Sequence, residues 1–188
     1  MKLLRKMRNL ILLSITILFQ YGCFSQNDSI SAIPLQDSVA TDSVKADSTV
    51  SFLFIGDIMG HDSQINAAYN ADSGRYIYDG YFTYLKDILA APDFTIANLE
   101  VTLAGPAYKG YPQFSSPDEL AIACRDAGMD VLVTANNHSC DRGKEGVIRT
   151  VQMLDSLKIL HTGTFSDSAD MKKNHPLILE KSGIKIAL

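Results

Sequence analysis

Short apolar runs alternate with helical segments along residues 49–188, and this alternation leaves few folds open. Residues 49–56 (TVSFLFIG), 94–98 (FTIAN) and 130–135 (DVLVTA) are short, apolar and rich in β-branched side chains, which is typical of buried strands. Segments of helical period lie between them. Strands that alternate with helices predict an α/β fold, in which helices pack over a mostly parallel sheet.

Two helices are predicted with defined ends. The first begins with Ser116 as N-cap and Glu119 completing a capping box, and Gly128 is its expected stop. The second covers residues 144–158, where apolar residues recur on one side. The remaining predicted strands are residues 160–164, 176–180 and 184–188, the last two joined by a tight turn.

Each of the three main predicted strands runs directly into a cluster of polar residues. The clusters are Gly56–His61 (GDIMGH), Asn98–Glu100 (NLE) and Asn136–Gly143 (NNHSCDRG). In open α/β sheets, ligands bind at the carboxyl ends of the strands. We therefore expect the three clusters to meet at one edge of the sheet and to form a binding site.

Taken singly, these residues have structural explanations. Asp57 can cap a turn, Asn136 and Asn137 can form one, and the histidine that follows can be an ordinary loop residue. Together they offer mixed oxygen and nitrogen donors, which favours a divalent cation such as Mn, Fe, Zn or Mg. A carboxylate, here Glu100, can bridge two ions about 3.5–4 Å apart in phosphate ester hydrolysis. His138 would then protonate the leaving oxygen or hold a phosphate oxygen.

Residues 1–22 have the pattern of a secretory signal peptide, in which a basic start precedes the apolar residues 10–19 (LILLSITILF). A run of this length is too short to cross a bilayer. Cys23 fits lipidation after lipoprotein processing, and ordinary cleavage after Ser25 is the alternative. The Ser- and Asp-rich residues 23–48 predict a disordered tether. We expect an exported protein of the cell envelope, either lipid-anchored or periplasmic or extracellular.

Charge and cysteine usage exclude two kinds of site. Four of the 17 basic residues lie within residues 1–22, so the remaining chain has 13 bases against 21 acids. Such a chain lacks the basic face that nucleic-acid binding requires. Cys124 and Cys140 are spaced unlike the ligands of a thiolate zinc site, and Cys124 lies in an apolar helical pattern that favours the core. A disulfide between them is left open.

The three clusters also carry a family resemblance. The strings FIGDIMGH, ANLEVTLAG and VTANNHSCDRGKEGVIRTVQML, in this order and spacing, resemble the CapA-type capsule and poly-γ-glutamate synthesis family. That family is related to the calcineurin-like metallophosphatases. The resemblance covers residues 50–188, and NNHxxDxGxxG is its most specific string.

The resemblance implies a metallophosphatase-like αββα sandwich with a metal-dependent centre. It implies Asp57 and Asn137 as metal ligands and Glu100 as the bridging carboxylate. His138 lies near the scissile group, and Asp141 is a further ligand or the partner of one. Substrate binding is assigned to four further polar residues of the clusters: His61, Asn98, Asn136 and Arg142.

The chain departs from the family pattern in two places. His61 stands where many members carry Arg, and it lies four residues after Asp57, whereas related metallophosphatases have Asp-x-His. The later histidine motifs that complete the metal shell in the family have no counterpart in this sequence. The only histidines after residue 138 are His161, interpreted as a structural or rim residue, and His175, interpreted as a loop residue. We expect residues 49–188 to be the N-terminal part of a larger domain, with an incomplete sandwich.

Two functions from different classes follow. The first is an exported protein of capsule or anionic-polymer biosynthesis with a divalent-metal phosphoesterase site that acts on a phosphate-bearing or polymeric substrate. The second is a non-catalytic module that uses the same fold to bind a polymer or an envelope polymer-synthesis protein. Tyrosines in residues 69–84 and 108–114 offer stacking surfaces for such a ligand, or else they pack within the protein.

Overall fold

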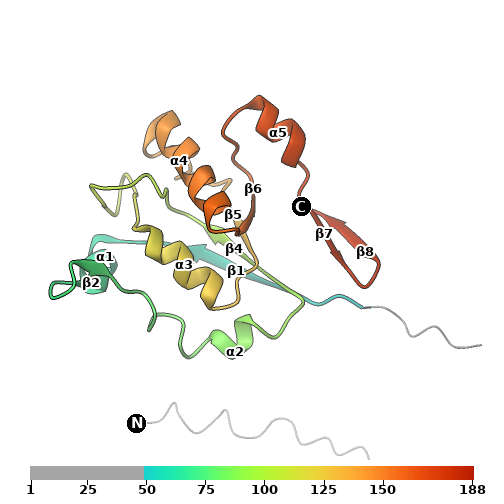
Figure 1. The fold of residues 1–188 in the computed structure, drawn as a ribbon, viewed down its shortest axis with the longest axis horizontal. Coiled ribbons are helices and arrows are strands. Elements are labelled where there is room, and N and C mark those ends of the chain that lie inside the picture. Colours follow the sequence, from blue (N-terminus) through green and yellow to red (C-terminus); the bar gives the residue numbers. More distant parts are fainter. Residues whose placement is uncertain (1–48) are drawn as a thin grey trace, which may run out of the picture. The chain divides into compact units, whose positions relative to one another are not determined.

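The computed structural model describes residues 49–188 (Figure 1). Its centre is a parallel sheet of four strands in the order β1-β4-β5-β6. The strands are β1 (Phe52–Ile58), β4 (Phe94–Leu99), β5 (Val131–Val133) and β6 (Leu160–Thr162). The expected signal peptide, the tether and Cys23 lie outside the described residues. The α/β prediction is confirmed.

The other elements are five helices and two small hairpins within residues 49–188. The helices are α1 (Asp62–Ala68), α2 (Lys86–Leu89), α3 (Asp118–Asp126), α4 (Gly143–Ser156) and α5 (Ser168–Asn174). The hairpins are β2 (Tyr69–Asn70) with β3 (Arg75–Tyr76), and β7 (Ile178–Lys181) with β8 (Ile184–Ala187). A two-residue turn joins β7 to β8, as the sequence predicts.

The two faces of the parallel sheet have different covers. Ala97 and Leu132 lie side by side in neighbouring strands and pack in the main core, to which α3 and α4 contribute (Figure 1). The preceding residue in each strand points to the opposite face, because side chains alternate along a strand. There Ile96 and Val131 pack against Leu179 of β7 in a second apolar cluster. The described residues therefore form a helical layer, a parallel sheet and a two-stranded sheet, β7-β8, that packs on the other face of the parallel sheet.

One predicted helix cap is wrong. Helix α3 begins at Asp118, and its N-cap is Pro117, which has no capping side chain. Ser116 is instead buried against Gly60, and its backbone N–H donates to the Thr102 carbonyl at 2.9 Å. The tertiary contact with Gly60 outweighs the local preference of serine for the cap position. The predicted stop is confirmed, since α3 ends at Asp126, shortly before Gly128.

An ion pair fixes the long loop that precedes α3. The Arg149 guanidinium of α4 donates to both carboxylate oxygens of Asp118 at 2.8 Å and also to the Leu103 carbonyl. The Leu103 N–H donates to the hydroxyl of Thr150, one residue further along α4, at 2.9 Å. Because both ends of residues 103–118 are held by α4, the loop between them has a defined position beside the sheet edge.

Cys124 and Cys140 are both free, with Cys124 buried and Cys140 exposed. Within residues 49–188, no helix has the length and apolarity needed to span a membrane.

Gly163 provides a test of how tightly β6 packs beside the polar clusters. Its φ is +110°, and an added Cβ would lie 2.5 Å from the Ala135 nitrogen, immediately before Asn136. We expect Gly163→Ala to lower the free energy of unfolding by about 3 kcal/mol, from backbone strain and overlap together. Urea denaturation measures this loss.

Gly183 is the matched control, because its φ is +79° but no atom lies within 4 Å of an added Cβ. Gly183→Ala should cost only about 1 kcal/mol, from the backbone alone. Equal losses for the two variants would contradict a close approach of Gly163 to Ala135.

Candidate functional site

The three polar clusters meet at the carboxyl edge of the sheet, because β1, β4 and β5 are parallel neighbours. The carboxamide of Asn98 joins the first two clusters. Its Nδ2 donates to Asp57 Oδ1 at 2.8 Å and to Glu100 Oε2 at 2.9 Å. Two carboxylates from different strands are thereby held on one amide group.

Asn136 joins the third cluster to the same point. Its Nδ2 donates to Asn98 Oδ1 at 3.0 Å and to the Leu99 carbonyl at 2.9 Å, while its Oδ1 accepts the His138 N–H at 3.0 Å. Asn98 and Asn136 therefore connect the strand ends to one another. Their assignment to substrate binding stays a prediction.

The junction carries an electrostatic strain that a cation would relieve. The pKa of Glu100 is raised, first by desolvation and then by its hydrogen bond and charge interaction with Asp57, while His138 and Asn98 act in the opposite direction. A carboxylate whose ionisation is disfavoured by a neighbouring carboxylate is stabilised in its charged form when a positive ion lies beside it.

His138 is oriented by Asp141. The Nδ1 of His138 lies 2.8 Å from Asp141 Oδ2, and their side chains are only 13% and 11% exposed. An ionised carboxylate only accepts hydrogen bonds, so Nδ1 carries the proton and donates it to Asp141. This leaves Nε2 as the nitrogen available to a substrate. The structure thus places Asp141 beside His138, and a role for Asp141 in metal binding stays a prediction.

Phe114 lies between the two histidines of the site. Its ring is fully buried, and its centroid is 4.6 Å from that of His138 and 5.1 Å from that of His61. The Phe114 N–H donates to the same Asp141 oxygen that accepts from His138, at 2.7 Å. The loop before α3 therefore fixes the position of the imidazole, and it brings His61 to the same surface.

Asn137 and Arg142 have different surroundings. Asn137 is exposed beside His138, a place from which its carboxamide can reach a ligand. Arg142 donates to the Ala107 carbonyl at 3.0 Å, and its Nε is buried without a partner among the described residues. The guanidinium thus lies against the loop before α3. A substrate contact by Arg142 stays a prediction.

The donors present fit one hard divalent ion better than two. Within residues 49–188, no group of three or more His, Cys, Asp or Glu side chains is placed to hold a metal. The junction offers the carboxylates of Asp57 and Glu100, with carboxamides nearby. Mg²⁺ and similar ions are commonly held by one or two carboxylates and retain several waters.

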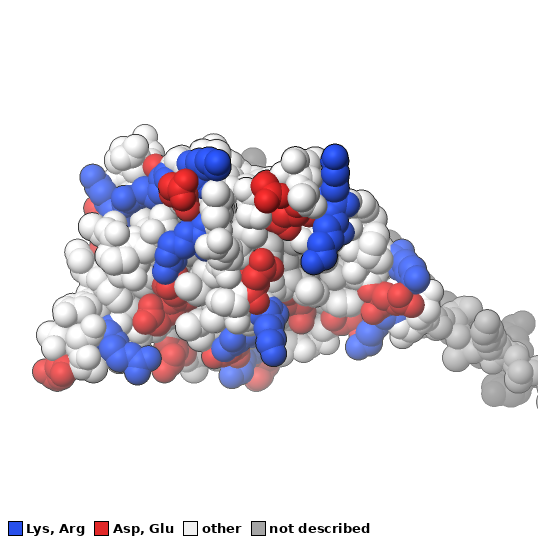
Figure 2. Space-filling view, turned by 45° about the horizontal axis from the view of Figure 1, so that its top comes forward, with Lys and Arg blue, Asp and Glu red and all other residues white. Residues whose placement is uncertain are grey.

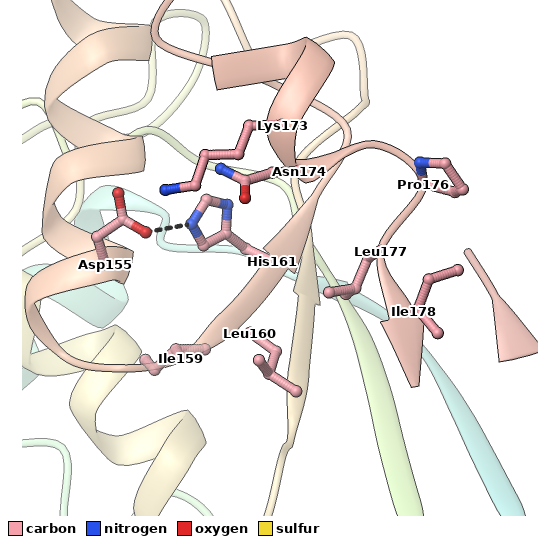
Figure 3. A pocket seen from close by; sticks show the side chains of 9 residues that line it. All are labelled: Asp155, Ile159, Leu160, His161, Lys173, Asn174, Pro176, Leu177 and Ile178. Carbon is pink, nitrogen blue, oxygen red and sulfur yellow. Dashed lines mark hydrogen bonds and ion pairs between the residues drawn. The ribbon is translucent and has the colours of Figure 1, made fainter. Parts of the chain in front are cut away.

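His161 lies apart from these clusters, as expected for a structural or rim residue. Its Nε2 is 3.1 Å from Asp155 Oδ1, and its ring is 12% exposed. It lines a cavity of about 350 Å³ between α4, β6, α5 and β7 (Figure 3). The cavity is lined by Asp155, Ile159, Leu160, His161, Lys173, Asn174, Pro176, Leu177 and Ile178, none of which belongs to the three clusters.

Ser139 is a residue of the site that sequence reasoning did not assign. Its hydroxyl accepts the Asn136 N–H at 2.9 Å and lies 2.5 Å from the Thr134 carbonyl, which it faces as a donor. It therefore shapes the turn that presents Asn137 and His138. The sequence signal for this role is the position of Ser139, which follows the turn-forming Asn136 and Asn137. A serine hydroxyl at such a position commonly forms a hydrogen bond with the backbone.

Comparison with known proteins identifies the family of this chain. The family model PGA_cap, described as bacterial capsule synthesis protein, matches residues 51–188. Capsule biosynthesis protein CapA of Bacillus anthracis is 26% identical over 144 residues, which are 72% of this chain and 33% of CapA.

Two further relatives are the uncharacterized proteins y4sH and y4uA of Sinorhizobium fredii (strain NBRC 101917 / NGR234). Each is 29% identical over 115 residues, which are 57% of this chain and 24% of the relative. The chain thus spans about a quarter to a third of the length of these relatives. The family model covers all three strand-end clusters, and the chain belongs to the bacterial capsule synthesis family PGA_cap.

Proposed function

We propose that the carboxyl edge of the sheet is a divalent-metal phosphoesterase site in an exported protein of capsule or anionic-polymer biosynthesis. The observation that carries this proposal is the junction of Asp57, Asn98 and Glu100 beside His138, whose orientation Asp141 fixes. Paired carboxylates next to an oriented imidazole combine a cation site with a group that transfers protons.

Asp57, Glu100 and Asn137 would hold the ion. Because these side chains offer oxygen donors, Mg²⁺ or Mn²⁺ fits them best, whereas Fe and Zn favour more nitrogen donors. When bound, the ion supplies positive charge to a phosphoryl oxygen and makes water more acidic. A second ion bridged by Glu100 would need ligands in addition to the described ones.

His138 would act on the ester oxygen of the substrate. Because Asp141 holds Nδ1–H, a protonated His138 presents Nε2–H to that oxygen and can donate the proton as the bond to phosphorus breaks. Asp141 stabilises the charged imidazole before transfer and keeps the ring in place. Phe114, packed on the ring, excludes water from one side of it.

The biological setting rests on the family and on the N-terminal sequence. Membership in PGA_cap and similarity to CapA support a role in capsule biosynthesis, with an anionic polymer or a phosphate-bearing molecule as substrate and envelope polymer-synthesis proteins as partners. The packing of β7 on the second face of the sheet supports a metallophosphatase-like sandwich. Lys and Arg are interspersed with Asp and Glu on the face shown in Figure 2, and the absence of a nucleic-acid partner stays a prediction.

Removal of either carboxylate tests the metal site. We expect Asp57→Asn and Glu100→Gln each to weaken Mn²⁺ binding at least about tenfold in isothermal titration calorimetry, because each loses one anionic donor. Asp87→Asn, on the exposed side of α2, should bind Mn²⁺ as the wild type does. Equal binding by all three variants would contradict the proposed site.

Hydrolysis of p-nitrophenyl phosphate and bis(p-nitrophenyl) phosphate under Mn²⁺ tests the role of His138. We expect His138→Asn to lower kcat by about 10²–10⁴ while Mn²⁺ affinity is kept, since only the proton donor is lost. Asp141→Asn should lower kcat less, and His175→Asn, a surface histidine, should leave it unchanged. Full activity in His138→Asn, or no hydrolysis by the wild type, would favour the non-catalytic binding module.

Export and lipidation are tested in cells that make the full chain. If Cys23 is acylated, the wild type should sediment with membranes in high salt, and Cys23→Ala should be released. Cys140→Ala, which changes an exposed thiol of the folded part, is the control and should stay with membranes. Release of the wild type itself would show ordinary signal cleavage.

A further inference from the structure

We propose that the ring of Tyr111 is the binding surface for the organic group of the substrate, and that this site takes phosphate esters whose substituent is an aromatic ring or a sugar with an apolar C–H face. This subsite rests on the proposed function, because it lies beside the imidazole assigned to the ester oxygen. It adds a specificity-determining residue to the metal and proton-transfer groups.

Tyr111 lies next to His138 and contributes little to the core. Its ring centroid is 6.5 Å from that of His138 and 6.4 Å from that of Phe114, and the residue is 68% exposed. Phe114 fills the space beneath the two rings and is fully buried. One aromatic residue of this loop therefore packs inside, while the other presents its ring to solvent at the edge of the site.

The loop that carries Tyr111 is held in place from both sides. Lys109 and Ser115 exchange two backbone hydrogen bonds of 2.9 Å, which close residues 109–115 into a compact turn. The Gly110 N–H donates to Asp62 Oδ1 of α1 at 2.6 Å, and the Phe114 N–H donates to Asp141. These bonds link the turn to helix α1, directly after the first cluster, and to the third cluster, so the loop that carries Tyr111 has a defined position.

Because its ring is exposed on an anchored loop, Tyr111 is better suited to binding a ligand than to stabilising the fold. An exposed ring on an anchored loop loses little conformational entropy when a ligand covers it. The apolar surface of the ring is removed from water only when a ligand packs on it. The imidazole of His138, whose Nε2 is assigned to the ester oxygen, lies next to this ring, and the substituent on that oxygen must lie within a few atoms of it.

The test compares two non-hydrolysable probes, inorganic phosphate and phenylphosphonate, on the Mn²⁺-loaded full chain by isothermal titration calorimetry. We expect the wild type to bind phenylphosphonate about 3–10-fold more tightly than phosphate, the range of one aromatic contact. Tyr111→Ala should lose this preference and keep its affinity for phosphate. Tyr111→Phe should keep the preference, because the ring and not the hydroxyl makes the contact.

Tyr84 is the matched control, since it is 96% exposed and its ring does not contact His138 or Phe114. Tyr84→Ala should bind both probes as the wild type does. Equal binding of the two probes by the wild type, or a preference that survives in Tyr111→Ala, would overturn the subsite alone. Binding of Mn²⁺ without binding of either probe would overturn the proposed phosphoesterase function and the subsite with it.

Discussion

The carboxamide of Asn98 holds the candidate site together. Parallel pairing brings the ends of β1, β4 and β5 to one edge, but it does not by itself orient the side chains there. Asn98 does so by donating to Asp57 and Glu100 and by accepting from Asn136. The chain of bonds continues from Asn98 through Asn136, whose Oδ1 accepts the backbone N–H of His138.

Much of the scaffold could be predicted from the sequence, because apolar period and strand–helix alternation report local structure directly. Strands β1, β4 and β5 and helix α4 lie within a few residues of their predicted ranges. The meeting of the three clusters also followed, since it depends only on parallel pairing. The cap at Ser116 failed because its burial against Gly60 depends on a residue far away in the chain.

The finer organisation of the site could not be predicted for the same reason. Nothing in the periodicity of the loop before α3 indicates that Phe114 packs on His138 or that its N–H shares Asp141 with the imidazole. These contacts depend on the position of the loop, whose two ends Arg149 holds against α4. The strand ends and the resemblance to CapA-type proteins indicated the residues of the site, whereas only the tertiary contacts show that Asn98 and Asn136 bond to one another.

The proposed site depends on a divalent cation that Asp57 and Glu100 share. The most direct measurement is a crystal structure of the protein grown with Mn²⁺, with data collected for the anomalous signal of manganese. We predict one strong anomalous peak within coordination distance of both carboxylates, with the Asn98 amide displaced from at least one of them. An ordered, metal-free junction at saturating Mn²⁺, with Asn98 still bonded to both carboxylates, would contradict it.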